Sequence, residues 1–235
     1  MQQACRSHNT LSSKTSAGQV SGLSHSSSAI LNGMATLREA QKQQTRQLLL
    51  DKGLELFESK GYPATTIDDI ASAAGTTRTT FYLHFSSKAE LMSELITTVD
   101  QILTTVDNPP LSTVVELGRR DLVRAWLDSK FDQWQVIRPY ILVAHQAAAG
   151  EPEVADKIES WFEDVTASMR EGLDRAGRFS PESRRVRCVL AFGQFEFLSR
   201  RWFLSGWTSD REVCLETLTD SWCHLLTDAG QAAAD

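Results

Sequence analysis

The residues best suited to chemistry form a short polar run in the first third of the chain, between Thr77 and His84. The guanidinium group of Arg78 can bond a guanine edge bidentately, and Thr79 can bond a base or meet a thymine methyl group. Thr77, Tyr82 and His84 are expected on the same exposed helix face. Such a set of side chains suits the major groove of DNA.

The elements that must position this run begin with a long amphipathic helix. From Leu37 to Lys60 there is no proline, and apolar or small residues recur at spacings of three and four, as in Leu49, Gly53 and Leu56. Gly61 is expected to end this helix.

Two short helices are predicted next. Thr66 is followed three residues later by Asp69, a variant of the capping box, at the start of a helix expected over 67–74. Gly75 supplies a turn residue that tolerates positive φ, and Thr77 can cap the next helix, which carries the polar run. Two short helices joined by a glycine-containing turn form a helix-turn-helix.

The segment from Thr45 to Leu91 resembles the DNA-binding domain of the tetracycline-repressor (TetR) family of regulators. The matching patterns are Leu-Phe-x-x-x-Gly-Tyr, Thr-Thr-Ile-x-x-Ile-Ala, Ala-Gly and Phe-Tyr-x-His-Phe-x-x-Lys-x-x-Leu, in the family's order and spacing. They cover about a fifth of the chain, and four linked patterns at fixed intervals are highly specific.

The resemblance implies a DNA-contact set. Arg78 and Thr79 are expected to read base edges. The phosphate contacts are expected from Thr66, Thr77, Thr80, Tyr82, His84 and Lys88, with backbone contacts added by Arg38, Lys42 and Arg46. Thr76 stands where the family usually has an apolar residue and Thr79 where glycine is common, so the bases that are read cannot be inferred.

Members of this set have structural alternatives. Thr66 and Thr77 could act only as helix caps, and Tyr82 and His84 could fill the edge of the core. Lys88 taken alone would be a solvated surface lysine.

The rest of the chain predicts an all-α protein with about nine helices in total, because no segment shows strict period-two alternation. The expected organisation is a disordered tail (1–36), a helix-turn-helix domain (37–87), a helical ligand-binding and dimerisation domain (88–230) and a short tail (231–235). Helix breaks are predicted at Asn108–Pro110, Arg138-Pro139, Gly150–Pro152, Gly177–Pro181 and Ser205–Ser209.

Aromatic residues are frequent in the C-terminal part and predict an apolar pocket for a small-molecule effector, although core packing is the simpler explanation for any one of them. The predicted pocket residues are Trp126, Trp134, Tyr140, His145, Trp161, Met169 and Phe195.

The segment from Arg185 to Trp207 is apolar on too many sides for a surface helix, so we expect burial on two faces. By resemblance, this helix and the last one pair with the same two helices of a second copy in a four-helix bundle across a twofold axis. The two helix-turn-helix domains of the dimer would then contact the two halves of a palindromic DNA site. The predicted interface residues are Phe197, Leu204, Cys214, Leu218, Trp222 and Leu225. Packing of these stripes within one chain is the alternative.

Two other functions are alternatives. A redox or metal signal would act through Cys188, Cys214, Cys223 and His224, but the cysteines lack ligand spacing, so no metal site is predicted. A helical enzyme or ligand carrier is the second alternative. The sequence contains no nucleophile-elbow, zinc-protease or phosphate-loop motif, so no catalytic residue and no cofactor is predicted.

The net charge of the whole chain is −6, but residues 92–235 carry −8 while residues 1–36 carry +2 and residues 37–91 are neutral, so the charge does not oppose DNA binding by the N-terminal part. No apolar run is long enough to span a bilayer and no secretory signal is recognisable, which favours a cytoplasmic protein without a membrane partner. Met34, just before the first periodic helix, is an alternative translation start.

Overall fold

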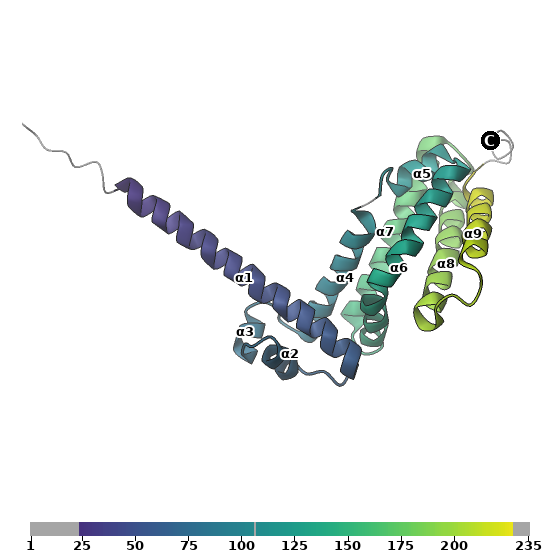
Figure 1. Ribbon diagram of the computed structural model, residues 1–235. Helices are drawn as coiled ribbons and strands as arrows, with labels where there is room; N and C mark the ends of the chain where they lie inside the picture. The colour runs from purple at the N-terminus through teal and green to yellow at the C-terminus, as the bar shows by residue number, and fades with distance from the viewer. Residues whose placement is uncertain (1–23, 106, 228–235) are drawn as a thin grey trace, which may run out of the picture. The chain divides into compact units, whose positions relative to one another are not determined.

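The computed structural model describes residues 24–105 and 107–227, and this part of the chain is helical without strands, which confirms the all-α prediction. Its nine helices are α1 (Ser24–Lys60), α2 (Ile67–Ala73), α3 (Arg78–Tyr82), α4 (Lys88–Thr104), α5 (Leu111–Leu117), α6 (Arg120–Ala148), α7 (Pro152–Ala176), α8 (Pro181–Ser205) and α9 (Arg211–Leu226) (Figure 1).

The described residues fall into two units, of which the second begins at Arg46. Residues 1–23 of the predicted N-terminal tail and the predicted tail 231–235 lie outside the described residues. Helix α1 begins at Ser24, within the segment predicted as a tail, and the domain boundary at residue 36 stays a prediction.

The second unit begins with the head, residues 46–87, in which α2 and α3 lie beside the C-terminal half of α1 (Figure 1). Its core contains the fully buried side chains of Leu49, Phe57, Ile70 and Phe81. Burial of each such side chain contributes about 1.5–3 kcal/mol of transfer free energy. This core holds the two short helices in place, since neither could be stable alone.

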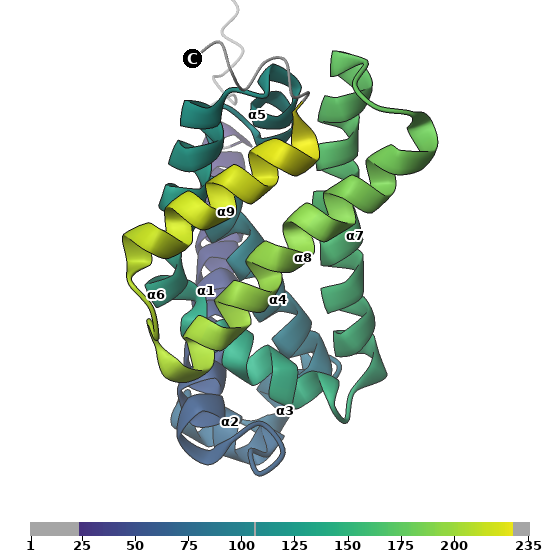
Figure 2. The same ribbon diagram turned by 90° about the vertical axis from the view of Figure 1, so that its right-hand side faces the viewer.

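Helix α4 joins the head to a bundle made of α5 to α9. A Cβ atom on Gly53 would lie 2.9 Å from Leu91 Cδ2, so the missing side chain lets α1 and α4 approach closely. In the bundle, α8 and α9 lie together on the face toward the viewer in Figure 2. Arg120 and Arg124 of α6 bond carboxylates of α9, including Asp220 at 2.8 Å.

Two helix boundaries differ from the predictions. Helix α6 continues through Pro139, because buried residues on both sides, among them Trp134 and Val143, offset the one backbone bond that proline removes. A break that was not predicted separates α5 from α6 at Gly118, whose φ of +65° suits glycine.

Candidate functional site

The turn of the helix-turn-helix is fixed by caps at both short helices. Thr66 is the N-cap of α2: its hydroxyl accepts from Asp69 N at 3.1 Å and its own N–H donates to Asp69 Oδ2 at 2.9 Å. The hydrogen bonds that the Thr66 N–H, Lys60 Nζ at 2.9 Å and the Thr66 hydroxyl donate to the Asp69 carboxylate lower its pKa to about 2. Thr77 caps α3 by accepting from Thr80 N at 3.2 Å. The predicted capping roles of Thr66 and Thr77 are confirmed.

The exposed face of α3 carries the predicted base-reading residues. Arg78 and Thr79 are exposed, and the Tyr82 side chain is 45% exposed. Arg78 Nη1 donates to Asp68 Oδ2 at 2.9 Å, and Nη2 donates to the Tyr82 hydroxyl at 3.2 Å. Because Asp68 lies on α2, this pair orients the guanidinium group between the two helices while leaving it in solvent.

Lys88 and Arg46 are held inside the head instead. Lys88 Nζ donates to the carbonyls of Tyr62 at 2.8 Å and Thr65 at 2.9 Å, and desolvation lowers its pKa. The Arg46 side chain pairs with Glu94 at 3.0 Å and lies over the Phe85 ring. His84 is half-buried next to the exposed face. Contacts of these three residues with phosphate stay predictions.

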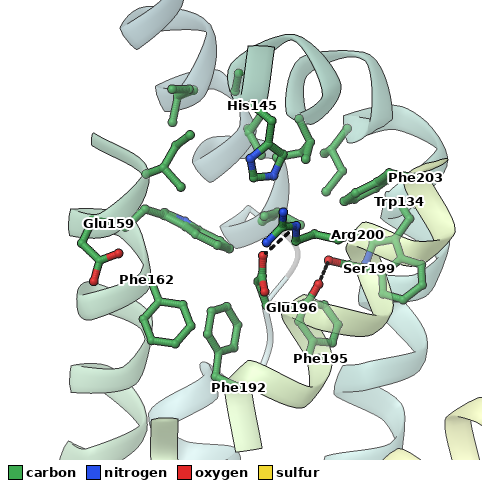
Figure 3. Close-up of a pocket in the computed structure, with 18 residues that line it drawn as sticks. Trp134, His145, Glu159, Phe162, Phe192, Phe195, Glu196, Ser199, Arg200 and Phe203 are labelled. Atoms are coloured by element: carbon green, nitrogen blue, oxygen red, sulfur yellow. Dashed lines mark hydrogen bonds and ion pairs between the residues drawn. The ribbon is translucent and has the colours of Figure 1, made fainter. Parts of the chain in front are cut away.

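A cavity of about 480 Å³ opens among α4, α6, α7 and α8 (Figure 3). Its walls are largely apolar, with aromatic and aliphatic side chains, and a few polar side chains reach it from α6, α7 and α8. The aromatic lining residues are Trp134, Trp161, Phe162, Phe192, Phe195 and Phe203. The polar ones are His145, Glu159, Glu196, Ser199 and Arg200.

A second cavity of about 430 Å³ lies next to the first, because both are lined by Ile96, Leu103, Trp161, Phe192 and Phe195. Trp126 lines the second cavity. The Trp161 indole N–H donates to Asp100 Oδ1 of α4 at 3.2 Å, so the shared wall is tied to that helix. Lys130 is buried and bonds Asp107 and the Leu103 carbonyl at the end of α4.

Five of the seven predicted pocket residues therefore line one or both cavities: Trp126, Trp134, His145, Trp161 and Phe195. Tyr140 and Met169 do not. Met169 is fully buried in the core, and Tyr140 packs against the core clusters of both the head and the bundle. For these two residues core packing replaces the predicted pocket role.

Residues 49–95 match the family model described as bacterial regulatory proteins, tetR family. TtgW, an HTH-type transcriptional regulator of Pseudomonas putida, is 34% identical to this chain over 96 residues, which are 41% of this chain and 70% of TtgW. The chain belongs to the TetR family. It is a DNA-binding transcriptional regulator.

Two further similar proteins match different parts of the chain. AcrR of Shigella flexneri is 44% identical over 62 residues, 26% of this chain, and the match spans only 29% of AcrR. The crystal structure of NalD, the secondary repressor of the MexAB-OprM multidrug efflux pump in Pseudomonas aeruginosa, aligns with a TM-score of 0.59 at 22% identity, over 80% of this chain and 98% of NalD. The likeness to NalD shows the fold alone.

The residues predicted for a TetR-type dimer interface fall into two groups. Phe197 is 67% exposed and Leu204 69%, and Cys214 and Leu225 are half-buried. Leu218 and Trp222 differ from the prediction, because they are buried in the protomer's own core. Trp222 stacks on Trp126 and donates its indole N–H to the Ala191 carbonyl at 2.9 Å. The stripe pattern on α9 alone could not separate an inward from an outward face.

Apart from His145, sequence reasoning missed the polar residues of the first cavity, above all Glu196 and Arg200. A signal was available: the two charges stand four residues apart on one helix face, within the largely apolar stretch 188–204. Among the described residues no group of three or more His, Cys, Asp or Glu side chains is placed to hold a metal ion. None of the described helices is both long and apolar enough to cross a membrane.

Proposed function

We propose that this TetR-family regulator is a cytoplasmic repressor that binds a palindromic operator as a homodimer and leaves it when a small, largely apolar effector fills the cavity. The observation that carries the proposal is the exposed, capped α3 with Arg78 and Thr79 at its start. Exposed polar side chains on a helix supported by a small core are what a major groove accepts.

Helix α4 supports the coupling between effector and DNA. Its first half is bound to the head through Leu91, Glu94 and Lys88. Its second half lines both cavities, and its residue Asp100 holds the Trp161 indole. An effector that binds more tightly to the protein with α4 in one position than in another would therefore change the positions of the DNA-binding heads.

The surface of α8 supports the dimer. Val186, Leu190, Phe197 and Leu204 are each more than half exposed, and their spacings of four and seven residues place them along one stripe of the helix. Such a stripe in water is costly, and a second copy across a twofold axis would cover it. We expect Phe197→Ser to shift the protein from dimer to monomer in sedimentation velocity, while the control Val136→Ser on α6 leaves the dimer intact.

Regulation through the cysteines is not favoured. Burial raises the pKa of Cys188 to about 11 and also raises those of Cys214 and Cys223. A raised pKa leaves little reactive thiolate at neutral pH. A Cys→Ser set at these three positions should keep full regulation.

The proposed function is tested by fluorescence anisotropy with the DNA upstream of the protein's own gene, at several salt concentrations and beside a scrambled duplex. We expect saturable binding to the upstream DNA that exceeds binding to the scrambled duplex at every salt concentration. The slope of affinity against salt then reports the number of phosphates contacted. Equal affinity for both duplexes would contradict specific operator binding there. A promoter-reporter assay distinguishes repression from activation.

A further inference from the structure

The wall of the first cavity contains six aromatic rings. Trp161 and Phe162 contact Phe192 with ring centroids 5.6 and 5.2 Å apart, and Phe195 packs on Trp134 at 5.6 Å. Aromatic faces carry negative electrostatic potential, so they attract an organic cation and gain area burial from its apolar groups.

Glu196 supplies a carboxylate inside this aromatic wall. Figure 3 shows its carboxylate in the cavity, between Phe192 and Arg200. Its ion pair with Arg200 is long, at 3.6 Å from Oε1 to Nε, compared with about 2.7–2.9 Å for a strong charge-assisted bond. The neighbouring Ser199 hydroxyl donates to the Glu196 backbone carbonyl at 2.8 Å and not to the carboxylate.

The positively charged groups around the cavity compensate the negative charge of Glu196 only in part. The Arg200 side chain is 57% exposed against 32% for Glu196, so the acid lies deeper. Burial, followed by the charge of Arg200, lowers the pKa of His145, which leaves the imidazole neutral at pH 7. Glu159 adds a second acid at an exposed position. Desolvation raises the pKa of Glu196, which marks a carboxylate short of compensating partners.

The second cavity has the same charge preference. Its lining includes Asp100, Asp107 and Asp164 against Lys130 and Lys157. Lys130 is already paired with Asp107. The charged groups outside this pair are the carboxylates of Asp100 and Asp164 and the exposed Lys157. An elongated ligand that passes the shared Trp161 wall would meet acidic groups again.

We propose that the effector is a lipophilic organic cation, with its charge beside Glu196 and its apolar groups against the aromatic rings of the first cavity. The inference rests on the proposed function, since it assigns the effector class of the same cavity. A lipophilic anion of the same size would place its charge against Glu196 and be rejected. Specificity would thus come from repulsion as well as attraction.

The test uses tetraphenylphosphonium and tetraphenylborate, two ions of matched shape and opposite charge, with the DNA-free full-length protein. Binding is followed by tryptophan fluorescence, because Trp134 and Trp161 line the cavity. We expect tetraphenylphosphonium to bind and tetraphenylborate to bind at least tenfold more weakly. Equal or tighter binding of the borate would overturn the proposal.

Variants locate the charge preference. Glu196→Gln should weaken tetraphenylphosphonium binding about tenfold, the size of one charge-assisted contact of about 1.4 kcal/mol. Arg200→Gln, which removes the competing cation, should strengthen binding a few-fold. The matched control Glu163→Gln on α7, whose carboxylate pairs with Arg185 and does not line the cavity, should leave the affinity unchanged. An unchanged affinity in Glu196→Gln, or weaker binding in Arg200→Gln, would contradict the proposed site.

Adding tetraphenylphosphonium to the protein–DNA complex separates this inference from the proposed function. Cation binding without release of DNA would support the ligand class and contradict effector-driven release. Specific DNA binding together with failure of the cation to bind would overturn the ligand class and leave the DNA-binding function in place.

Discussion

The head and the bundle place their candidate functional residues by different means. In the head, the side-chain hydrogen bonds that shape the α3 face and the turn before it span at most ten residues of sequence: Thr66 with Asp69, Thr77 with Thr80, and Asp68 with Arg78. In the bundle, the cavity is lined by four helices, and the Trp161 bond to Asp100 spans 61 residues. The recognition surface is therefore a local product of the sequence, and the cavity is a product of packing.

This difference predicts where substitutions change stability. The residues of the α3 face point into solvent, so their replacement should affect binding and not folding. The bundle residues fill space between helices, so their replacement should affect folding first.

The largest effect is expected at Trp222, where core packing replaced the predicted interface role. Trp222→Ala should lower the free energy of unfolding by about 3–5 kcal/mol, because it leaves a cavity under Trp126 and removes the indole hydrogen bond to the Ala191 carbonyl. Phe197→Ser, the exposed aromatic control on α8, should change that free energy little when measured on the monomer by chemical denaturation. Trp222→Ala made in the Phe197→Ser monomer and found as stable as Phe197→Ser alone would restore the interface interpretation.

Two glycines sharpen the comparison. A Cβ atom on Gly172 of α7 would lie 2.3 Å from the Ser112 carbonyl oxygen of α5, and backbone cannot give way easily. Gly172→Ala should cost about 1–3 kcal/mol of stability. In the head, Gly53→Ala meets only the mobile end of Leu91, and the gain in helix propensity of about 1 kcal/mol offsets the contact. Thermal unfolding of the two variants should separate them clearly; equal melting temperatures would contradict the rigid α5–α7 contact.

A substitution at Lys88 can separate its structural role inside the head from its predicted contact with a DNA phosphate. Lys88→Met should destabilise the protein by about 1–2 kcal/mol, since the Tyr62 and Thr65 carbonyls lose their donor. If the lysine is only structural, the salt dependence of DNA binding by the folded variant stays the same. A salt slope lower by about one would instead assign Lys88 to a phosphate.

The smallest effect is expected at the cap of α2. The pKa of Asp69 falls from 3.8 to about 2 on folding, so its contribution is present above pH 4 and is lost as the pH falls toward 2. Asp69→Asn should therefore melt below the wild type at pH 7, with a difference that narrows over that acid range. A difference that does not vary with pH would exclude the carboxylate as the cause.

The same contrast explains what the sequence could predict. The bounds of α2 and α3 and the cap residues followed from local signals, and six of the helices were expected after Ser86, as found. The number agreed because a wrong break at Pro139 balanced a missed one at Gly118. The proline and the glycine are local signals, and neither contains information on the tertiary packing that decides whether a helix continues.

The cavity was less predictable for a related reason. Aromatic content indicated a pocket, but which rings line it depends on side-chain directions in four packed helices, so Met169 was misplaced and Glu196 was missed. The inward turn of Trp222 likewise depends on how α9 lies against α6 and α8.

The central claim is that the exposed face of α3 reads DNA sequence, and Arg78→Ala tests it most directly against the control Arg185→Ala, another exposed arginine in a surface ion pair. In anisotropy titrations of a DNA that the wild type binds specifically, we expect Arg78→Ala to raise the Kd about 5- to 150-fold, equivalent to about 1–3 kcal/mol, with much less change for scrambled DNA. Arg185→Ala should match the wild type on both duplexes. Unchanged operator affinity in Arg78→Ala, or an equal loss on both duplexes, would contradict sequence reading by this face.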